Sequence, residues 1–396
     1  TRALSSAASD VYKRQVSTIY SDELDKNATT SPYNAIYGLL PGLTVMQNTS
    51  WGTDKSRLNV RGRGSLNGDT PLFVVDGFAR PIEYINLSEI ESISVLKDGA
   101  ATALWGGRGA NGVVLITTKR GMYSKKEIKV DYKFGLGLPV NQPEFADAYT
   151  YAKARNEALR YDGLQPDMDE ASFLAGGNRD LYPNVDWQKE ALRNHTTSHQ
   201  LDITFRGGGK RLRYFSVLNY KNDMGLLNSK YTDYTDRYNS QMKKYFLNLR
   251  MNLDVDITDA TKLKLNMLGM LRETKRPTTS EATLFEQIFN TPSAAFPVQT
   301  QNGLWGSNNV LKTNPIANLA DVGYYKLNQR MLQADLRLIQ DLSVLTRGLS
   351  AELAIAYDNN ATYQETAKKS FMSVSYTHLR AHATDQYLVC RLLLEK

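Results

Sequence analysis

Two patterns of hydrophobic and polar positions divide the sequence, and they meet near Gly121. Before that point, short apolar runs alternate with glycine-containing turns. Short apolar runs bounded by turn residues predict strands, and alanine-rich pieces between them favour short helices. This segment is therefore predicted to be a small α+β domain, with strands at Leu43–Gln47, Leu58–Arg61, Leu72–Val75, Ile90–Leu96 and Gly112–Thr118, and helices at Pro32–Leu40 and Ala100–Leu104.

From Glu127 onward, apolar and polar residues alternate one by one over long stretches. In Phe246–Ile257, aliphatic side chains occupy one face of the expected strand, and asparagine, arginine and aspartate occupy the other. This period of two is typical of a strand with different surroundings on its two faces. The run exceeds the usual strand of about 5–6 residues. At about 3.3 Å per residue and about 45° tilt, it spans roughly the hydrocarbon core of a bilayer.

The connections between these segments are short and long in turn. Thr258–Thr261 is a short turn, whereas Pro139–Ser198 is a long polar loop. Short turns at one rim and long loops at the other are typical of outer-membrane barrels, and such loops are unusual in a soluble sandwich. Bacterial barrels have an even number of strands. We therefore expect an incomplete barrel, with seven strands at about residues 127–138, 198–206, 211–221, 244–257, 262–272, 328–342 and 349–363.

Both ends of the sequence look foreign to the rest. Thr1–Gln15 and Val374–Lys396 resemble translated sequencing-adaptor read-through, so we expect residues 1–15 and 374–396 to be artefacts. The single cysteine, Cys390, lies in the second of these stretches. Without it, the sequence offers neither a disulfide framework nor a thiol nucleophile.

Charge and hydropathy narrow the class of protein further. The net charge is +7, but lysine and arginine are spread along the chain and mixed with acidic residues. This mixing predicts no nucleic-acid partner, because such partners are bound by concentrated basic surfaces. No run of about 18 apolar residues predicts a transmembrane helix. The mean hydropathy of −0.44 is compatible with barrel strands, since their two faces average out.

The first segment resembles the plug domain of TonB-dependent receptors of the SusC/RagA type. The matching stretches are Leu40–Gln47, Leu58–Gly77 and Ile85–Gly121, and the last is the most specific. In it, an acidic and apolar strand leads through a Lys-Asp-Gly turn and an alanine-rich helix to a glycine-rich loop and a final strand. Over the later part of the chain, the resemblance rests on strand architecture and on Asn184–Leu192.

This resemblance implies a mainly β fold. A small α+β plug domain, residues 16–121, would be followed by residues 122–373 as the N-terminal part of an antiparallel transmembrane β-barrel. The seven strands would be part of a much larger barrel.

Several residues of the plug motif are candidate contacts between the plug and the barrel wall. Arginine side chains could pair with acids on the inner wall through charged hydrogen bonds. The Asp-Gly pairs fit tight turns, and other glycines allow backbones to pack closely. The candidates are Arg61, Arg63, Asp76, Gly77, Lys97, Asp98, Gly99, Arg108, Gly109 and Gly112.

The substrate-binding residues are less well defined by the sequence. Aromatic side chains in the long loops and at the plug apices could stack on sugars, but they could equally pack the loops or form a membrane girdle. The candidates are Trp51, Trp305, Tyr324 and Tyr325.

Other signals do not predict an enzyme, a metal site or a cofactor. Gly107, Gly109 and Gly112 match a dinucleotide fingerprint, but they precede a strand instead of opening a helix. His195 and His199 lie four residues apart before an expected strand, where loop histidines are commoner than a metal pair. No nucleophile elbow and no Walker loop occurs.

The resemblance implies active import across the bacterial outer membrane, in contact with outer-membrane lipid. The TonB–ExbB–ExbD complex would supply the energy, and a SusD-like surface lipoprotein would cover the channel. The implied substrate is a glycan or an oligopeptide. Two alternatives remain open at this point: a siderophore or cobalamin receptor of the same fold, and a β-rich surface protein for binding or adhesion without transport.

Overall fold

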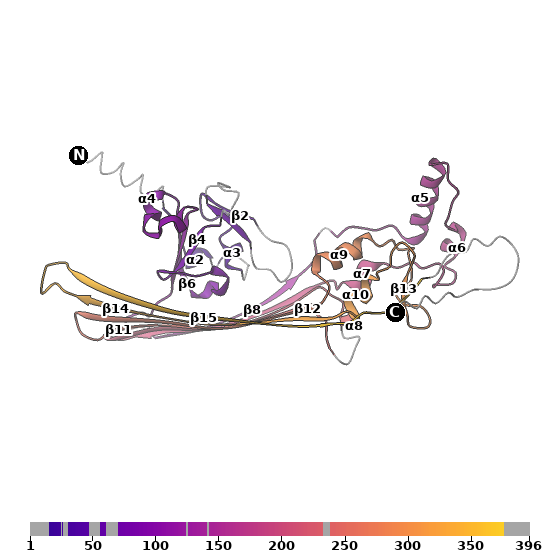
Figure 1. The fold of residues 1–396 in the computed structure, drawn as a ribbon. Coiled ribbons are helices and arrows are strands. Elements are labelled where there is room, and N and C mark those ends of the chain that lie inside the picture. The colour runs from indigo at the N-terminus through magenta and orange to yellow at the C-terminus, as the bar shows by residue number, and fades with distance from the viewer. Residues whose placement is uncertain are drawn as a thin grey trace.

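The computed structural model describes residues 16–24, 26, 31–46, 56–60, 70–123, 126–140, 142–232 and 238–375. An N-terminal α+β domain lies against one face of a long sheet, and helices gather at one end of that sheet (Figure 1). The described residues include no helix that is long and apolar enough to cross a membrane.

The N-terminal domain is built on a five-stranded sheet in the order β1-β6-β7-β4-β5. Its strands are β1 (Val16–Tyr20), β4 (Leu72–Val75), β5 (Phe78–Ala79), β6 (Ile90–Leu96) and β7 (Val113–Thr118). A separate antiparallel pair consists of β2 (Leu43–Met46) and β3 (Arg57–Val60). The helical elements are α2 (Ser21–Leu24), α3 (Pro32–Ala35), η1 (Ile82–Tyr84), η2 (Leu87–Glu89), α4 (Gly99–Thr102) and η3 (Ala103–Gly109).

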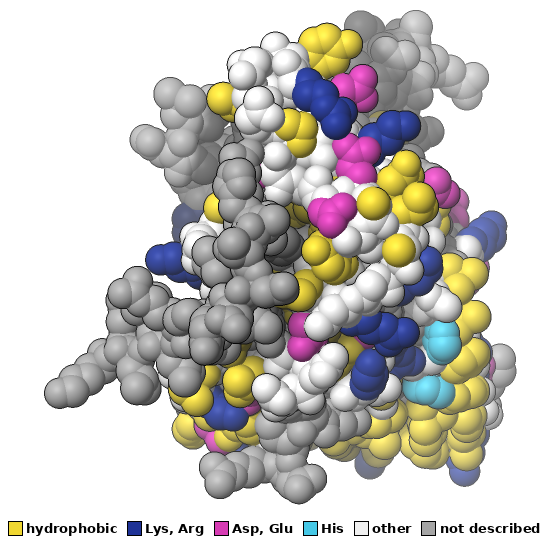
Figure 2. Space-filling view, turned by 90° about the vertical axis from the view of Figure 1, so that its right-hand side faces the viewer, with side chains coloured by type: hydrophobic (Ala, Val, Ile, Leu, Met, Phe, Trp, Pro, Cys, Tyr) yellow, Lys and Arg dark blue, Asp and Glu magenta, His cyan; other side chains and the backbone are white. Residues whose placement is uncertain are grey.

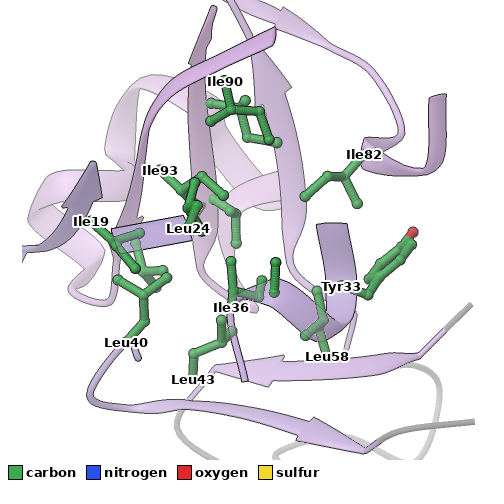
Figure 3. Packing of buried hydrophobic residues seen from close by; sticks show 14 of the residues in the cluster. Ile19, Leu24, Tyr33, Ile36, Leu40, Leu43, Leu58, Ile82, Ile90 and Ile93 are labelled. Carbon is green, nitrogen blue, oxygen red and sulfur yellow. The ribbon is translucent and has the colours of Figure 1, made fainter. Parts of the chain in front are cut away.

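One hydrophobic core holds this domain together. Ile19, Leu24 and Ile36 converge with Ile93 between the sheet and the short helices (Figure 3). Ile90 and Ile93 are both buried although their spacing is odd, because a bulge shifts the register between Ile90 and Ser92. A bulge inserts one residue into a strand and so changes which side chains share a face.

The long sheet has seven antiparallel strands, each paired with its sequence neighbour among them. This confirms the predicted mainly β fold, with a plug-like domain followed by a partial antiparallel sheet. Most of the strands extend beyond the predicted bounds. They are β8 (Glu127–Gly137), β9 (Thr196–Gly208), β10 (Leu212–Met224), β11 (Lys243–Asp256), β12 (Thr261–Pro277), β14 (Gly323–Asp341) and β15 (Ser350–Lys368).

The two faces of this sheet have opposite chemistry. On β11, Leu249 is 44% exposed on the outer face, whereas Asn248 and Arg250 are 0% and 2% exposed on the inner face. The inner face is covered by the N-terminal domain. The outer face carries a belt of exposed apolar side chains that includes Ile128, Val130, Tyr132, Leu247, Leu249, Met267, Leu271, Leu332, Leu336, Leu353 and Ile355.

The long loops fold into a layer with its own hydrophobic core. That core contains Trp187, Leu227, Leu284, Phe296 and Trp305, which come from different loops. These loops were predicted as polar connections, because their apolar residues are too scattered for any one loop to form a core. The elements are α5 (Ala148–Tyr161), α6 (Glu170–Ala175), α7 (Trp187–Ala191), α8 (Ser229–Thr232), α9 (Glu281–Asn290), β13 (Trp305–Ser307), α10 (Pro315–Ala320) and β16 (Ser373–Ser375).

Some local predictions differ from the structure. The helix expected at Pro32–Leu40 ends at Ala35, and Gly38 adopts a positive φ of 72° shortly after it. The helix expected at Ala100–Leu104 begins at Gly99 and continues as η3 to Gly109. Strands β1 and β5 were missed. Of the proposed terminal artefacts, residues 1–15 and 376–396 lie outside the described residues, while Val374 and Ser375 belong to β16.

Gly112 gives a test of the close packing inside the N-terminal domain. It has φ +90°, and a Cβ atom there would lie 2.9 Å from the Val60 Cβ. Gly112→Ala should therefore destabilise the domain by about 1–3 kcal/mol, through backbone strain and the clash. Hydrogen exchange of the β4 and β7 amides measures this loss. Gly107→Ala is the matched control, since nothing lies within 4 Å of its Cβ position. Equal loss of protection in both variants would contradict the packing argument.

Candidate functional site

The candidate site is the contact between the N-terminal domain and the inner face of the long sheet. Strand alternation places polar residues of β9–β15 on that face. The domain meets them mainly with charged and amide side chains.

Glu89 is at the centre of the contact. It ends η2, where it forms a capping box with Asn86, whose backbone N–H donates to Glu89 Oε1 at 3.2 Å. From β11, Arg250 Nε donates to Glu89 Oε2 at 2.5 Å, and the Asn248 amide donates to Glu89 Oε1. The Glu89 and Arg250 side chains are 0% and 2% exposed. The contact therefore contains a buried ion pair that joins the N-terminal domain to the long sheet.

Burial raises the pKa of the Glu89 carboxyl, and the Arg250 guanidinium opposes part of that rise. A buried carboxylate is costly unless it is paired and hydrogen-bonded. The long sheet forms a wall against the N-terminal domain. The pairing of Glu89 depends on this wall, because Arg250 and Asn248 both come from its strand β11.

A second cluster joins η2 to β9 and β10. Asn219 donates to Ser88 Oγ at 2.8 Å and to Asp202 Oδ1 at 2.9 Å. Gln200 donates to Asp202 Oδ2 at 2.6 Å. Asp202 is buried, so these amides supply the hydrogen bonds that its carboxylate needs.

Arg80 forms a third cluster, just beyond β5. Its Nη1 lies 2.5 Å from Asp335 Oδ1 on β14, and its Nη2 lies 2.7 Å from Asp358 Oδ1 on β15. Asn266 also donates to Asp335, at 2.5 Å. The Arg80 guanidinium carbon lies 5.2 Å from the centre of the Phe78 ring. One buried arginine of the domain therefore links two wall strands.

Asp76 and Gly77 form a tight turn that touches the wall. Asp76 has a φ of 48°, and its carboxylate accepts hydrogen bonds from the Thr118 amide and hydroxyl at 3.0 and 2.6 Å. Arg337 of β14 donates to the Asp76 carbonyl at 3.0 Å. A Cβ atom at Gly77 would lie 2.7 Å from the Arg337 guanidinium. The wall arginine thus reaches the backbone here because Gly77 has no side chain.

The end of the domain is held in the same way. Arg120 pairs with Asp254 at 3.0 Å. Asn252 donates to Thr118 Oγ1 and to the Lys119 carbonyl, both at 2.8 Å. Apolar contact between the two bodies includes one small cluster, in which Tyr84 packs on wall residues including Leu268 and Met331.

The wall side of the contact is incompletely hydrogen-bonded. Several buried polar atoms on the inner face of the wall strands have no hydrogen-bond partner among the described residues. They are the side-chain oxygens of Gln200, Asn219, Asn248, Asn252 and Asn266, and Nη2 of Arg250. Burying such atoms without a partner costs free energy, and this cost is recovered when water hydrates them. Their presence lowers the net cost of separating the domain from the wall.

The predicted plug residues are distributed over several environments. Asp76 and Gly77 lie at the wall contact. Lys97 Nζ donates to Ser17 Oγ at 2.6 Å within the domain. Asp98 precedes α4 without a side-chain capping bond, and Gly99 starts that helix. Gly109 is buried against Thr102.

Of the three predicted arginines, Arg108 alone lies among the described residues. Arg108 is exposed and has no ion pair with any described residue. Arg61 and Arg63 lie outside the described residues. Arg80, Glu89 and Arg120 make the charged contacts instead. The sequence gives only a weak signal for these three residues: each lies close to the end of a predicted or observed strand, where charged side chains are common.

The aromatic candidates also differ among themselves. Trp305 is 4% exposed in the loop core, and its indole N–H donates to Asp321 at 3.3 Å, so it packs the loops. Tyr324 donates its hydroxyl to Glu365 at the loop end of the wall. The Tyr325 ring lies 4.2 Å from the Arg276 guanidinium carbon. Trp51 lies outside the described residues.

No group of three or more potential metal-ligating side chains occurs in the part of the chain that the structure describes. His199 contacts Tyr132 through Nδ1 at 2.8 Å, and its ring lies 5.2 Å from that of Phe134.

Removing one partner of the buried pair should weaken the contact. Arg250→Met leaves the Glu89 carboxylate buried without its cation, which should cost about 3–5 kcal/mol. Protease accessibility of the N-terminal domain in the intact protein measures the change. Adding Glu89→Gln to Arg250→Met should restore most of the protection, because no charge then remains buried. An Arg250→Met protein as protected as the original would rule out this role for the pair.

In Arg250→Met, the protease protection of the N-terminal domain should depend on pH. Burial raises the pKa of Glu89, so the docked state holds its proton more tightly than the undocked state. Docking is therefore favoured below the ordinary glutamate pKa of about 4.3 and weakens as pH rises through the raised value. In Arg250→Met, no guanidinium opposes the increase in the pKa of Glu89. Protection of the N-terminal domain from protease should therefore recover on acidification. Glu89→Gln is the control and should show no such recovery.

Comparison with known proteins gives consistent matches. Residues 11–113 match the family model of the TonB-dependent receptor plug domain. The chain is 31% identical to the TonB-dependent receptor SusC of Bacteroides thetaiotaomicron over 228 residues, which are 54% of this chain and 21% of SusC. It is also 31% identical to the TonB-dependent receptor P3 of Formosa agariphila over 273 residues, 67% of this chain and 24% of that receptor.

The fold matches a solved structure as well. The RagAB peptide importer in its closed-closed state superposes with a TM-score of 0.70 at 20% identity, over 89% of this chain and 41% of that one. The chain spans about a quarter or less of the length of the curated relatives it matches. The plug match, the SusC relationship and the shared fold lead to one conclusion. The chain belongs to the TonB-dependent receptors of the SusC/RagA type, of which it carries the plug domain and seven wall strands.

Proposed function

We propose that this protein imports a glycan or an oligopeptide across the bacterial outer membrane, driven by TonB. Residues 16–121 form the plug of the channel, and residues 122–373 form part of its wall. Receptors of this family are outer-membrane transporters, and one structural relative is described as a peptide importer. The proposed role requires no cofactor and no catalysis.

The polar contact between plug and wall carries this proposal. A plug that must leave the channel in each cycle cannot be held by a large hydrophobic core, because exposing that core to water would cost about 25 cal/mol per Å². Charged and amide groups exchange their partners for water at lower net cost. The contacts of Glu89, Arg80 and Asn219 fit this requirement.

The two rims of the wall support an orientation. The short turns face the periplasm, and the folded loop layer faces the cell exterior, where substrate binds. Trp51 and Tyr325 are the proposed aromatic contacts for substrate, because Tyr324 shares the outer face of β14 with Lys326 and Arg330. A SusD-like lipoprotein covers the loop layer from outside.

Energy enters at the N-terminal end of the plug. TonB, energised by ExbB and ExbD, pulls a segment that precedes the plug sheet. Among the described strands, β1 lies at the edge of that sheet and pairs with β6 alone. An edge strand is released by breaking one ladder of hydrogen bonds, so β1 is the first part of the plug to detach from the sheet.

A disulfide across the contact tests whether import needs the plug to move. Ser88→Cys with Asn219→Cys places two thiols where the native side chains are hydrogen-bonded at 2.8 Å. Uptake of labelled glycan or peptide by cells should fall at least tenfold when this pair is oxidised, because the plug can no longer leave the wall. Reduction should restore uptake.

The control is a disulfide within the wall. Thr261→Cys with Gln340→Cys joins β12 to β14, where the native side chains are 2.7 Å apart. Oxidation of this pair should leave uptake unchanged. Uptake that continues with the plug locked would contradict import by movement of the plug. Failure of the unlocked protein to support any uptake would favour a binding or adhesion protein, and uptake of iron chelates or cobalamin alone would favour the other class of receptor.

A further inference from the structure

Basic side chains gather on the inner face of the wall at its loop end, beyond the contact with the plug. Lys221 on β10, Lys244 on β11 and Arg272 on β12 line one pocket together with Glu83 of the plug. Arg276 lies four residues further along β12, so strand alternation places it on the same inner face. These four cations therefore face the channel side of the wall.

Carboxylates offset only part of this charge. Asp223 pairs with Lys221 at 2.8 Å and accepts the Ser198 hydroxyl at 2.5 Å. Glu83 is the other carboxylate of the pocket lining. With Arg276 added to the pocket residues, four cations face two carboxylates, which leaves two positive charges in excess. The loop end of the inner face is therefore basic, and it favours an anionic ligand.

Arg276 is held in one orientation above Tyr325. The two residues are directly opposite each other on β12 and β14, and the guanidinium carbon lies 4.2 Å from the ring centre. Nη1 donates to the carbonyls of Pro277, Thr278 and Thr279 at 3.0, 3.4 and 3.3 Å. Nε and Nη2 donate to none of the described residues. A guanidinium fixed in this way can offer its remaining N–H groups to a planar oxyanion.

Uncharged polar side chains surround this arginine and its tyrosine. Thr366 on β15 is opposite Tyr325, and Gln364 accepts the Tyr325 hydroxyl at 3.4 Å. Thr274 and Gln329 occupy inner positions nearer the plug. Hydroxyl and amide groups can both donate and accept hydrogen bonds, as the hydroxyls of a sugar do. These surroundings suit a sugar better than they suit the apolar side chains of a peptide.

The outer face at this height is a different environment. Leu247 and Leu271, which alternate with Phe246 and Arg272, are 39% and 51% exposed on that face. Seen from the loop end, hydrophobic side chains are stacked along the edge of the sheet, and lysine and arginine side chains lie nearer the middle of the view (Figure 2). A charged, water-soluble ligand therefore meets Arg272 and Arg276 from the inner side.

We propose that these cations select an acidic glycan, one that carries carboxylate or sulfate groups. Arg276 binds one acidic group, and the basic pocket around Arg272 attracts another. The two arginines are about 13 Å apart along β12 at about 3.3 Å per residue, so the ligand that reaches both is an oligosaccharide. The proposal rests on the proposed function, in which it narrows the substrate from a glycan or an oligopeptide to an acidic glycan.

Binding of the purified intact protein, in detergent, to an oligosaccharide array tests this selection. The array carries oligosaccharides with uronate carboxylates, with sulfate esters or with neither, and oligoglutamate as the acidic peptide. Acidic oligosaccharides should bind, and their binding should weaken as sodium chloride is added, because salt screens exposed charges. Binding of uronates alone or of sulfated sugars alone identifies which acidic group the site takes.

Arg276→Gln should lose at least tenfold in affinity for the acidic oligosaccharides, because a charged hydrogen bond is removed. Arg276→Lys should keep part of this affinity, since the positive charge remains. Lys275→Gln is the matched control: it removes the neighbouring cation, which points to the outer face, and it should bind normally.

Binding of neutral oligosaccharides alone, of oligoglutamate in preference to every glycan, or of no acidic oligosaccharide would overturn the proposal. So would an equal loss of affinity in Arg276→Gln and Lys275→Gln. The salt dependence is measured on the unaltered protein, so it remains decisive if Arg276→Gln does not fold. The assay needs neither TonB nor movement of the plug, so a failure of import and a failure of glycan selection are separate results.

Discussion

The fully buried carboxylate of Glu89 is the constraint on which the arrangement of plug and wall depends. A buried charge needs a cation and hydrogen bonds, and β11 supplies both through Arg250 and Asn248. These residues lie on the same face only because they are two apart on a strand. A shift of β11 by one residue would present Leu249 together with Leu247 or Met251 to Glu89 instead. Pairing this carboxylate therefore specifies the register of the wall against the plug.

The same alternation gives the wall its second surface. Many residues that point a polar group at the plug are flanked by neighbours that point apolar groups outward, as Leu249 and Met251 flank Arg250. The inner face gains hydrogen bonds with the plug, and the outer face gains a low-polarity belt. The same alternation thus suits a polar plug surface on one face and low-polarity surroundings on the other. A single polar residue at an outward position would interrupt the apolar belt.

The loop layer and the rim show how charge is arranged beyond the belt. Loops that are polar on average bury Trp187, Phe296 and Trp305 together, because residues from several connections contribute to one core. Below this layer, Lys243, Lys275 and Lys326 become neighbours although they are far apart in sequence. Strand register, rather than sequence proximity, concentrates the positive charge at this rim.

The sequence by itself determined the α+β domain, the seven alternating strands and the division into short turns and long loops, because these follow from local periodicity and turn chemistry. The sequence also predicted the tight turn at Asp76–Gly77. Only the tertiary structure decided which side chains join plug to wall. Arg80 meets Asp335 across 255 residues, and Glu89 meets Arg250 across 161. Periodicity reports which face a residue occupies, but it does not report what lies opposite that face.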